Sequence, residues 1–310
     1  MQIYPEPARE LVSRMTAKAT ALPSQAVAFQ GAPGAFSHLA TCQVFPEGLP
    51  LPCFSFDEAF EAVESGKADR AVIPIENSYA GRVAEIHFLL PASRLHIVGE
   101  HFLRVRHSLL APKGAKLENV RQAFSHPQAL SQTRKWCAAR GIDQVPYADT
   151  AGAAALVAEK QEPGTSAVAS SFAGQIYDLD ILAEGIEDVA HNTTRFVVLA
   201  REPITPDPAK GPLMTTIFFE VRNIPAALFK ALGGFATNGI NITKLESYQR
   251  EGTFTATDFF ADFEGSPEDP AVQRALEELE FHSKRLRIFG TYAQALTRLH
   301  PDALDEQASG

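Results

Sequence analysis

Cysteine is scarce in this chain, which has three among its 310 residues, at Cys42, Cys53 and Cys137. The count is odd and no C-x-x-C pair occurs. These features argue against a disulfide framework, and reduced, buried thiols are expected, as in a cytoplasmic protein.

Several signatures of common catalytic and cofactor sites are also absent. The nine histidines form no H-E-x-x-H pattern and have no cysteine cluster beside them, so no metal site is expected. The G-x-S-x-G elbow of serine hydrolases does not occur. The one glycine loop that follows an apolar run lacks the third glycine of the dinucleotide fingerprint, which argues against a nicotinamide or flavin cofactor.

Long apolar runs and an excess of basic residues are missing too. No segment approaches the roughly 18 apolar residues that a membrane-spanning helix needs, and charged residues precede the first apolar stretch, unlike a signal peptide. A formal net charge of -9 argues against a nucleic-acid surface. Because this charge repels anions at long range, an anion site must be built from locally placed donors.

The length suits two domains. Residues 1–24 predict an N-terminal extension with a helix that ends before Pro23. From there, short apolar runs such as 26–30 and 71–75 alternate with helical stretches such as 128–140. This alternation predicts a layered, mostly parallel α/β sheet.

A proline-rich segment divides the chain. Four prolines lie between residues 203 and 212, which predicts a linker. Beyond it, residues 213–291 follow the order βαββαβ of a ferredoxin-like unit, with a turn at 251–252. Residues 292–310 form a tail.

Two polar loops stand at predicted strand ends. The first, Gly-Ala-Pro-Gly-Ala-Phe-Ser, contains Gly34 and ends at Ser37. Its free amides can hold a carboxylate at the start of a helix, although a plain turn with a capping serine explains it equally well. The second places Glu76, Asn77 and Ser78 after an apolar strand, where ligands bind in open α/β sheets. A helix cap accounts for only one of these three side chains, so we favour a binding site.

Two further stretches carry polar groups. Ser125 and Gln132 flank a helix start, and His126 before its proline is more often structural than catalytic. Arg195 can bind a carboxylate through two parallel hydrogen bonds. The adjacent Thr194 can assist a leaving hydroxyl if the site is shaped and dry. The alternative is an edge strand in which threonine suits the sheet.

Taken in order, the glycine loop and the runs Pro-Ile-Glu-Asn-Ser, Ser-His-Pro-Gln and Asn-x-Thr-Arg-Phe resemble the signatures of prephenate dehydratases, over about residues 25–290. The resemblance implies two lobes shaped like a type II periplasmic binding protein, in a catalytic domain of residues 25–202 whose second lobe spans about 104–184. It also implies a C-terminal ACT regulatory domain at 213–291. The implied reaction is the decarboxylative dehydration of prephenate to phenylpyruvate in L-phenylalanine biosynthesis, by a hydro-lyase that needs no cofactor because aromatisation drives the step.

Site residues follow from the same resemblance. Thr194 matches the family's catalytic threonine, and Arg195 is the second catalytic residue. We expect Arg195 and loop amides to hold the carboxylate that stays on the product, while Thr194 assists the departing hydroxyl. The substrate-binding positions are Gly34, Ser37, Glu76, Asn77, Ser78, Ser125, Gln132 and Phe196.

The C-terminal unit departs from its relatives at two motifs. Ala226-Ala227-Leu228 stands where relatives commonly have Gly-Ala-Leu, and Glu246-Ser247-Tyr248-Gln249 stands where they have Glu-Ser-Arg-Pro. We still expect L-phenylalanine as an allosteric effector. Its expected contacts are Asn223, Ala226, Ala227, Leu228, Glu246 and Ser247. Because ACT domains usually pair between chains, a homodimer or homotetramer is expected.

Two alternatives stay open. Arogenate dehydratases run the same reaction on a substrate with an amine in place of the keto group, and a carboxylate such as that of Glu76 could favour this amine. A non-catalytic sensor is the other alternative, since two-lobed folds often only bind. Turnover on each substrate separates the three cases.

Overall fold

The computed structural model describes residues 4–189, 191–207, 209, 211–249 and 256–299. Its described part divides into two compact units. Unit 1 holds residues 4–86 and 101–196, and unit 2 holds residues 87–100 and 197–299. No helix among these residues combines the length and apolar character that a membrane span requires.

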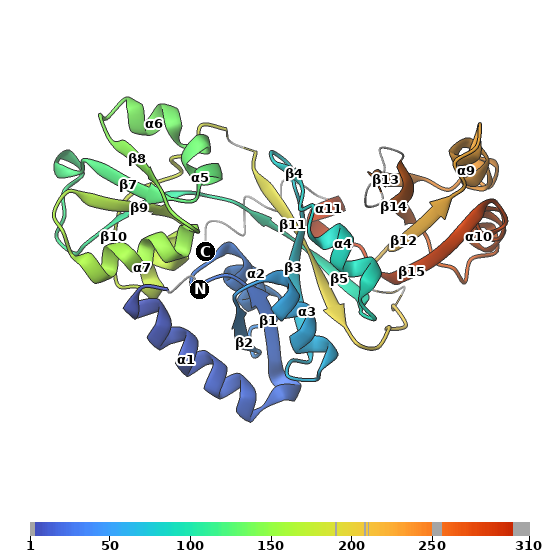
Figure 1. Cartoon of the computed structure of the whole chain (residues 1–310), viewed down its shortest axis with the longest axis horizontal. Helices are drawn as coiled ribbons and strands as arrows, with labels where there is room; N and C mark the ends of the chain where they lie inside the picture. Colours follow the sequence, from blue (N-terminus) through green and yellow to red (C-terminus); the bar gives the residue numbers. More distant parts are fainter. Residues whose placement is uncertain (1–3, 190, 208, 210, 250–255, 300–310) are drawn as a thin grey trace. The chain divides into compact units, whose positions relative to one another are not determined.

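The first sheet has the strand order β2-β1-β3-β11-β5, with the short β4 paired to β3 (Figure 1). β1 runs parallel to both β2 and β3. The central strands of this first sheet are apolar runs that are buried on both faces, as is typical of parallel strands covered by helices. The bounds are β1 Ala26–Gln30, β2 Leu49–Cys53, β3 Arg70–Asn77, β4 Gly81–Arg82, β5 His96–Arg104 and β11 Thr193–Ala200.

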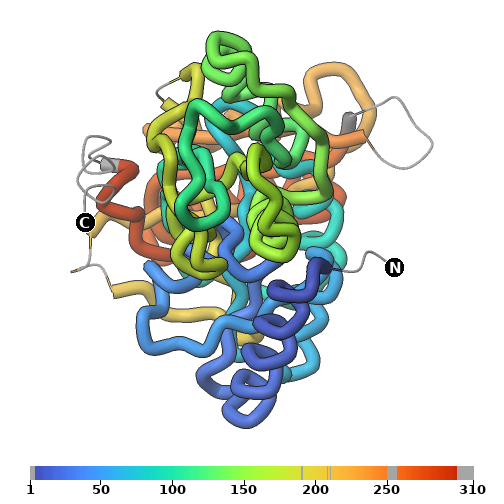
Figure 2. Tube along the Cα trace, turned by 90° about the vertical axis from the view of Figure 1, so that its left-hand side faces the viewer, coloured from blue at the N-terminus to red at the C-terminus, as the bar shows by residue number. Residues whose placement is uncertain are grey.

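Helices α2 (Phe36–Val44) and α3 (Phe56–Glu64) pack on this sheet. The Ser55 hydroxyl caps α3 by accepting a hydrogen bond from the amide of Glu58. α1 (Glu6–Ala21) is followed by a short 3-10 turn, η1 (Pro23–Gln25). α1 contacts β2 and also α7 (Thr150–Lys160), and both views of the chain draw it next to α7 (Figures 1 and 2).

The second sheet of unit 1 has the order β10-β6-β9-β7-β8. β7 is parallel to β8 and β9, whereas β6 is antiparallel to β9 and β10, so this sheet is mixed. α7 packs its alanine-rich face on the sheet, and small side chains let helix and strands approach closely. The bounds are β6 Ser108–Ala111, η2 Leu117–Asn119, β7 Gln122–Ser125, β8 Asp143–Pro146, α7 Thr150–Lys160, β9 Thr165–Ala169, α8 Ser171–Ile176 and β10 Asp180–Glu184.

The single helix predicted over residues 128–140 is wrong. Two short helices occupy this region, α5 (Pro127–Gln132) and α6 (Arg134–Ala138). The break falls at Thr133, whose hydroxyl donates back to the carbonyl of Ala129 at 3.0 Å. The Asp188 carboxylate then accepts from the first amides of α6, which gives this helix a start of its own.

The C-terminal sheet of unit 2 is antiparallel, with the order β13-β14-β12-β15. α9 and α10 cover one face, where their apolar residues meet inward side chains such as Phe219, Phe259 and Phe263. The bounds are β12 Leu213–Val221, α9 Ala227–Thr237, β13 Ile242–Gln249, β14 Ala256–Glu264, α10 Pro270–His282, β15 Ser283–Ala293 and α11 Leu296–Leu299. The predicted turn at 251–252 and most of the predicted tail lie outside the described residues.

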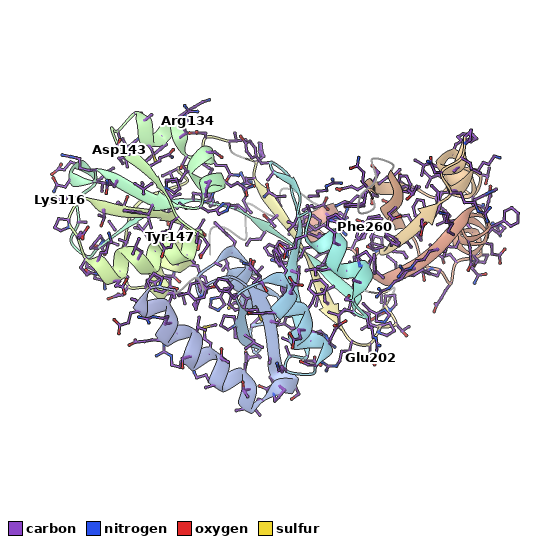
Figure 3. The ribbon with its side chains drawn as sticks, viewed as in Figure 1. Lys116, Arg134, Asp143, Tyr147, Glu202 and Phe260 are labelled. Carbon is purple, nitrogen blue, oxygen red and sulfur yellow. The ribbon has the colours of Figure 1, made fainter. Side chains whose placement is uncertain are left out.

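The other face of this sheet meets α4 (Ile86–Ala92). The His87 ring stacks on Tyr248 at 4.8 Å and meets Phe260, labelled in Figure 3, at 5.0 Å. The Arg287 guanidinium donates to the carbonyls of Leu90 and Ser93 at the end of α4. The architecture confirms the predicted α/β class, with two lobes and a C-terminal βαββαβ unit.

Candidate active site

A cavity of about 260 Å³ lies within unit 1. It is lined by strand ends and helix starts from both sheets, which is where ligands collect in α/β folds. The lining residues are Gln30, Gly31, Ala35, Phe36, Ser37, Pro74, Asn77, Val83, Val105, His107, His126, Gln128, Ala129, Gln132, Asp149, Thr150, Asn192, Thr194 and Phe196.

Thr194 lies on β11 and faces this cavity together with Phe196. The Asn77 amide donates to the Thr194 hydroxyl oxygen at 2.9 Å and to the Asn192 side-chain oxygen at 2.7 Å. The Asn77 side-chain oxygen accepts from the backbone amides of Tyr79 and Ala80, which fixes this orientation of the amide. Because Thr194 accepts here, its own proton is left to be donated elsewhere.

Arg195 is placed differently from the sequence-based expectation. Successive side chains of a strand point to opposite faces, so Thr194 and Arg195 cannot both face the cavity from β11. Arg195 is 2% exposed, does not line the cavity, and forms an ion pair of 2.9 Å with Glu76. Glu76 does not line the cavity either.

Ser78 and Ser125 hold the backbone rather than line the cavity. The amide of Ser78 donates to the carbonyl of Thr193 at 2.8 Å, and its hydroxyl accepts from the amide of Thr193 at 2.9 Å. The buried Ser125 hydroxyl donates to the carbonyl of Val168 at 2.6 Å. Ser78 therefore fixes the start of β11 beside β3, while Ser125 ties β7 to β9.

Gln132 joins the two lobes at the cavity. Its side-chain oxygen accepts from the Asn192 amide at 3.0 Å and is 2.8 Å from the His107 ring nitrogen Nε2. The backbone carbonyl of Asn192 also accepts from the amide of Val105 at 2.8 Å. Residues 105–107 and 191–192, which connect the two sheets, are thereby held beside α5.

The glycine loop is fixed at Gly34, which does not itself line the cavity. Gly34 has φ +91°, a conformation that side chains rarely adopt, and an added Cβ would meet the Cα of Ala173 at 3.1 Å. Its amide donates to Nδ1 of His38, and burial lowers the pKa of His38 to about 4. His38 is therefore a neutral, structural acceptor.

The start of α2 follows this loop and opens on the cavity through Phe36 and Ser37. No side chain caps this helix. The first amides of a helix have no partner within it and carry partial positive charge, so they attract anions. α7 also begins at the cavity, but the Asp149 carboxylate already accepts from its amide at Gly152, and burial raises the pKa of Asp149.

Among the described residues that line the cavity, none is lysine or arginine. An anionic ligand would therefore be held by amides and hydroxyls, as the net negative charge of the chain led us to expect. The described residues also contain no group of three His, Cys, Asp or Glu side chains arranged for a metal ion.

Several cavity residues were not among the predicted site residues, and His107, Asp149, Thr150 and Asn192 are examples. Asp149-Thr150 carries a helix-cap signal, which indicates a helix start but no ligand. Asn192 belongs to the Asn-x-Thr-Arg-Phe run, so that run did contain a signal. Nothing local marks His107, because only tertiary contacts bring it to Gln132.

The expected effector residues lie in unit 2. Ala226 adopts a left-handed conformation, φ 62° and ψ 15°, directly before α9. The Glu246 carboxylate accepts from the Tyr248 hydroxyl at 3.0 Å and pairs with Lys244 at 3.3 Å. Asn223 and Ser247 are exposed, Ala227 is buried and Leu228 is partly buried.

Comparison with known proteins identifies the family of this chain. Residues 27–204 match the family model described as prephenate dehydratase. The chain is 48% identical over 275 residues to a bifunctional N-acyl-homoserine lactone acylase/prephenate dehydratase of Komagataeibacter europaeus, covering 89% of this chain and 98% of that one. It is 43% identical over 280 residues to arogenate dehydratase 2 of Petunia hybrida, covering 86% of this chain and 71% of the relative.

Comparison with a solved structure points to the same family. The prephenate dehydratase of Arthrobacter aurescens, in complex with L-Phe, superposes with a TM-score of 0.79 at 27% identity, covering 92% of this chain and all of that one. The family model spans more than half of the residues printed in the sequence. The chain therefore belongs to the prephenate dehydratase family of hydro-lyases.

Proposed function

We propose that this chain converts prephenate into phenylpyruvate in the cavity of unit 1, with Thr194 as the donor to the leaving hydroxyl. One observation carries the proposal: Asn77 donates to the Thr194 oxygen at 2.9 Å. The Thr194 proton is thereby directed away from Asn77. A donor held in place before the reaction stabilises charge as it develops, without reorganising at the transition state.

The reaction then proceeds without a cofactor. The bond from the ring to its carboxylate breaks, and its electron pair enters the ring as CO2 leaves. The ring carbon–oxygen bond breaks with its electron pair on oxygen, and Thr194 donates to that oxygen, which departs as water after taking one proton. Solvent replaces this proton, and the aromatic ring of phenylpyruvate is the driving force.

The carboxylate that remains on the product is held, in this proposal, by the first amides of α2 and by the Ser37 hydroxyl. Both line the cavity with Thr194. Arg195 acts instead through Glu76: the pair holds β3 against β11, the two strands that carry Asn77 and Thr194. The ring carboxylate needs no strong partner, since it has to leave.

Prephenate is favoured over arogenate. The ammonium group of arogenate would be bound best by a carboxylate in the cavity. Glu76, the candidate from the sequence, is paired with Arg195 and does not line the cavity. Asp149 does line it but already caps α7. We expect kcat/KM for prephenate to exceed that for arogenate, measured with the purified chain; the reverse order would make it an arogenate dehydratase, and no turnover of either would leave a sensor.

Regulation is proposed for residues 213–291 as an ACT domain, after a catalytic domain of residues 25–202 and a linker of residues 203–212. L-phenylalanine is the proposed effector, because the related Arthrobacter aurescens protein was solved with L-Phe and because the unit has the βαββαβ order. We also propose that the chain forms a homodimer or homotetramer in the cytoplasm. Calorimetry with L-phenylalanine tests the binding of the effector, and light scattering tests the oligomeric state.

A further inference from the structure

His107 ends a chain of side-chain hydrogen bonds that begins at Thr194. The chain runs from the Thr194 hydroxyl through the amides of Asn77, Asn192 and Gln132 to the His107 ring, with successive distances of 2.9, 2.7, 3.0 and 2.8 Å. All five residues line the cavity. The three amides of this chain are called the amide relay below.

Each member of the amide relay fixes the orientation of the next. Asn77 must donate through its nitrogen, because its oxygen accepts from two backbone amides. Asn192 therefore accepts from Asn77 through its oxygen and turns its nitrogen toward Gln132. The Gln132 oxygen accepts the hydrogen bond from Asn192. An oxygen cannot donate, so its second partner, Nε2 of His107, must carry the proton of the bond between them.

The surroundings of His107 hold it in that form. The residue is 2% exposed, and its ring packs against the Phe36 ring in an edge-to-face arrangement. Burial lowers the pKa of His107, while the bond to Gln132 and the nearby Glu187 act in the opposite direction. The Glu187 carboxylate accepts from the backbone amide of His107 at 3.0 Å, which fixes the residue beside the cavity. Nδ1 has no hydrogen-bond partner among the described residues, so the neutral ring presents one donor and directs it at Gln132.

We propose that His107 is a positioning residue that fixes the orientation of the amide relay and thereby keeps the Thr194 proton free for the leaving hydroxyl. Without a donor at Nε2, the Gln132 amide can rotate and present its nitrogen to that of Asn192. Two donors then face each other, Asn192 turns, and Asn77 loses the acceptor that holds it beside Thr194. This inference rests on the proposed role of Thr194.

Two substitutions separate this role from a structural one. His107→Gln places an amide donor that can reach the Gln132 oxygen but does not titrate, whereas His107→Leu fills similar space without a donor. We expect His107→Leu to lower kcat by about 10- to 100-fold, since small misplacements of catalytic groups have effects of this size, with KM for prephenate little changed. His107→Gln should recover most of the lost kcat.

The opposite results are equally clear. Wild-type kcat in folded His107→Leu overturns the inference, and so does an equal loss of kcat in both variants. If His107→Leu fails to fold, the 15N signals of His107 in the wild-type protein decide: a proton on Nε2 supports the inference and a proton on Nδ1 overturns it. Thr194→Ala is assayed beside them, because loss of kcat there with full kcat in His107→Leu rejects the inference alone, whereas full kcat in Thr194→Ala rejects the proposed function.

Discussion

The Asn77 amide donates a hydrogen bond of 2.9 Å to the hydroxyl oxygen of Thr194 across two neighbouring strands, β3 and β11. A threonine is a poor acid by itself, so this contact matters because it sets the direction in which the Thr194 hydroxyl can donate. The hydroxyl accepts from Asn77 and so does not donate to it, and Thr194 faces the cavity. Two residues separated by 117 positions in the chain thus fix the direction of one hydrogen bond at the cavity.

Removing the hydroxyl tests the donor directly. Thr194→Ala should lower kcat for prephenate by about 10²- to 10³-fold, the usual loss when one preorganised donor to a developing negative charge is deleted, with KM little changed. Thr194→Ser keeps a hydroxyl and should retain most of the activity. Thr193→Ala is the matched control, because Thr193 does not line the cavity. Phenylpyruvate formation measures all three, and normal turnover of Thr194→Ala would contradict the assignment.

Reversing the hydrogen bond at Asn77 tests its direction. Asn77→Asp keeps the shape and the oxygen that accepts from Tyr79 and Ala80, but a carboxylate cannot donate to Thr194. The threonine would then donate to the new carboxylate, so we expect kcat to fall by about 10- to 100-fold. Thermal unfolding should change much less than kcat. Retained kcat would show that the direction of this bond is unimportant.

Substitutions at the Glu76–Arg195 ion pair distinguish a structural role of Arg195 from a role in substrate binding. Arg195→Met leaves the Glu76 carboxylate without its arginine, and we expect a loss of about 3 kcal/mol of unfolding free energy. The loss should fall at the lower end of the usual range, because the Glu76 side chain is 31% exposed. Urea unfolding measures it, and the double variant with Glu76→Gln should recover part of the stability. A rise of 100-fold or more in KM without loss of stability, a change of about 3 kcal/mol in binding, would show that Arg195 holds the substrate.

Part of the element order was predictable from the sequence, because central parallel strands are near-continuous apolar runs. β1 has the predicted bounds, residues 26–30, and the βαββαβ order of unit 2 was also expected. β2, Leu49–Cys53, escaped prediction because Pro50 and Pro52 cannot donate to a sheet. It is tolerated as the edge strand of its sheet, with β1 as its neighbour.

The site was only partly predictable, for a physical reason. Thr194, Asn77, Ser37 and Gln132 follow from motifs and do line the cavity. Arg195 sits beside Thr194 in the same motif, and its orientation depends on the residue at which β11 begins. In the sequence, the apolar run of this strand begins only at Phe196. In the structure β11 already starts at Thr193, and the alternation of a strand then turns Arg195 away from Thr194.

Ala226 is a strained residue that directly precedes α9. Its φ of 62° lies in the left-handed region, which costs a residue with a Cβ roughly 1–2 kcal/mol. Ala226→Gly should therefore stabilise the protein by about 0.5–1 kcal/mol after the extra backbone entropy of glycine is subtracted. Ala227→Gly, one residue further along and inside the helix, is the control and should destabilise. Equal effects of the two changes in thermal unfolding would contradict this account.

His38 makes the stability of the protein depend on pH. Burial lowers its pKa to about 4, whereas in the unfolded chain it titrates near 6.5. Below pH 6.5 the unfolded state binds a proton that the folded state does not, so stability falls as pH decreases from 6.5 to about 4. At pH 5 the difference amounts to about 2 kcal/mol.

The variant His38→Asn isolates this contribution. Its side-chain oxygen can still accept from the amide of Gly34, the partner of Nδ1 in the wild-type chain, but it does not titrate. The loss of unfolding free energy between pH 7 and pH 5 should therefore be about 2 kcal/mol smaller in the variant than in the wild-type protein. Comparing the two pH dependences, rather than the absolute stabilities, removes the cost of the substitution itself and the contributions of other buried histidines. Urea unfolding at both pH values provides the measurement, and parallel pH dependences would mean that His38 is protonated as readily in the folded chain as in the unfolded one.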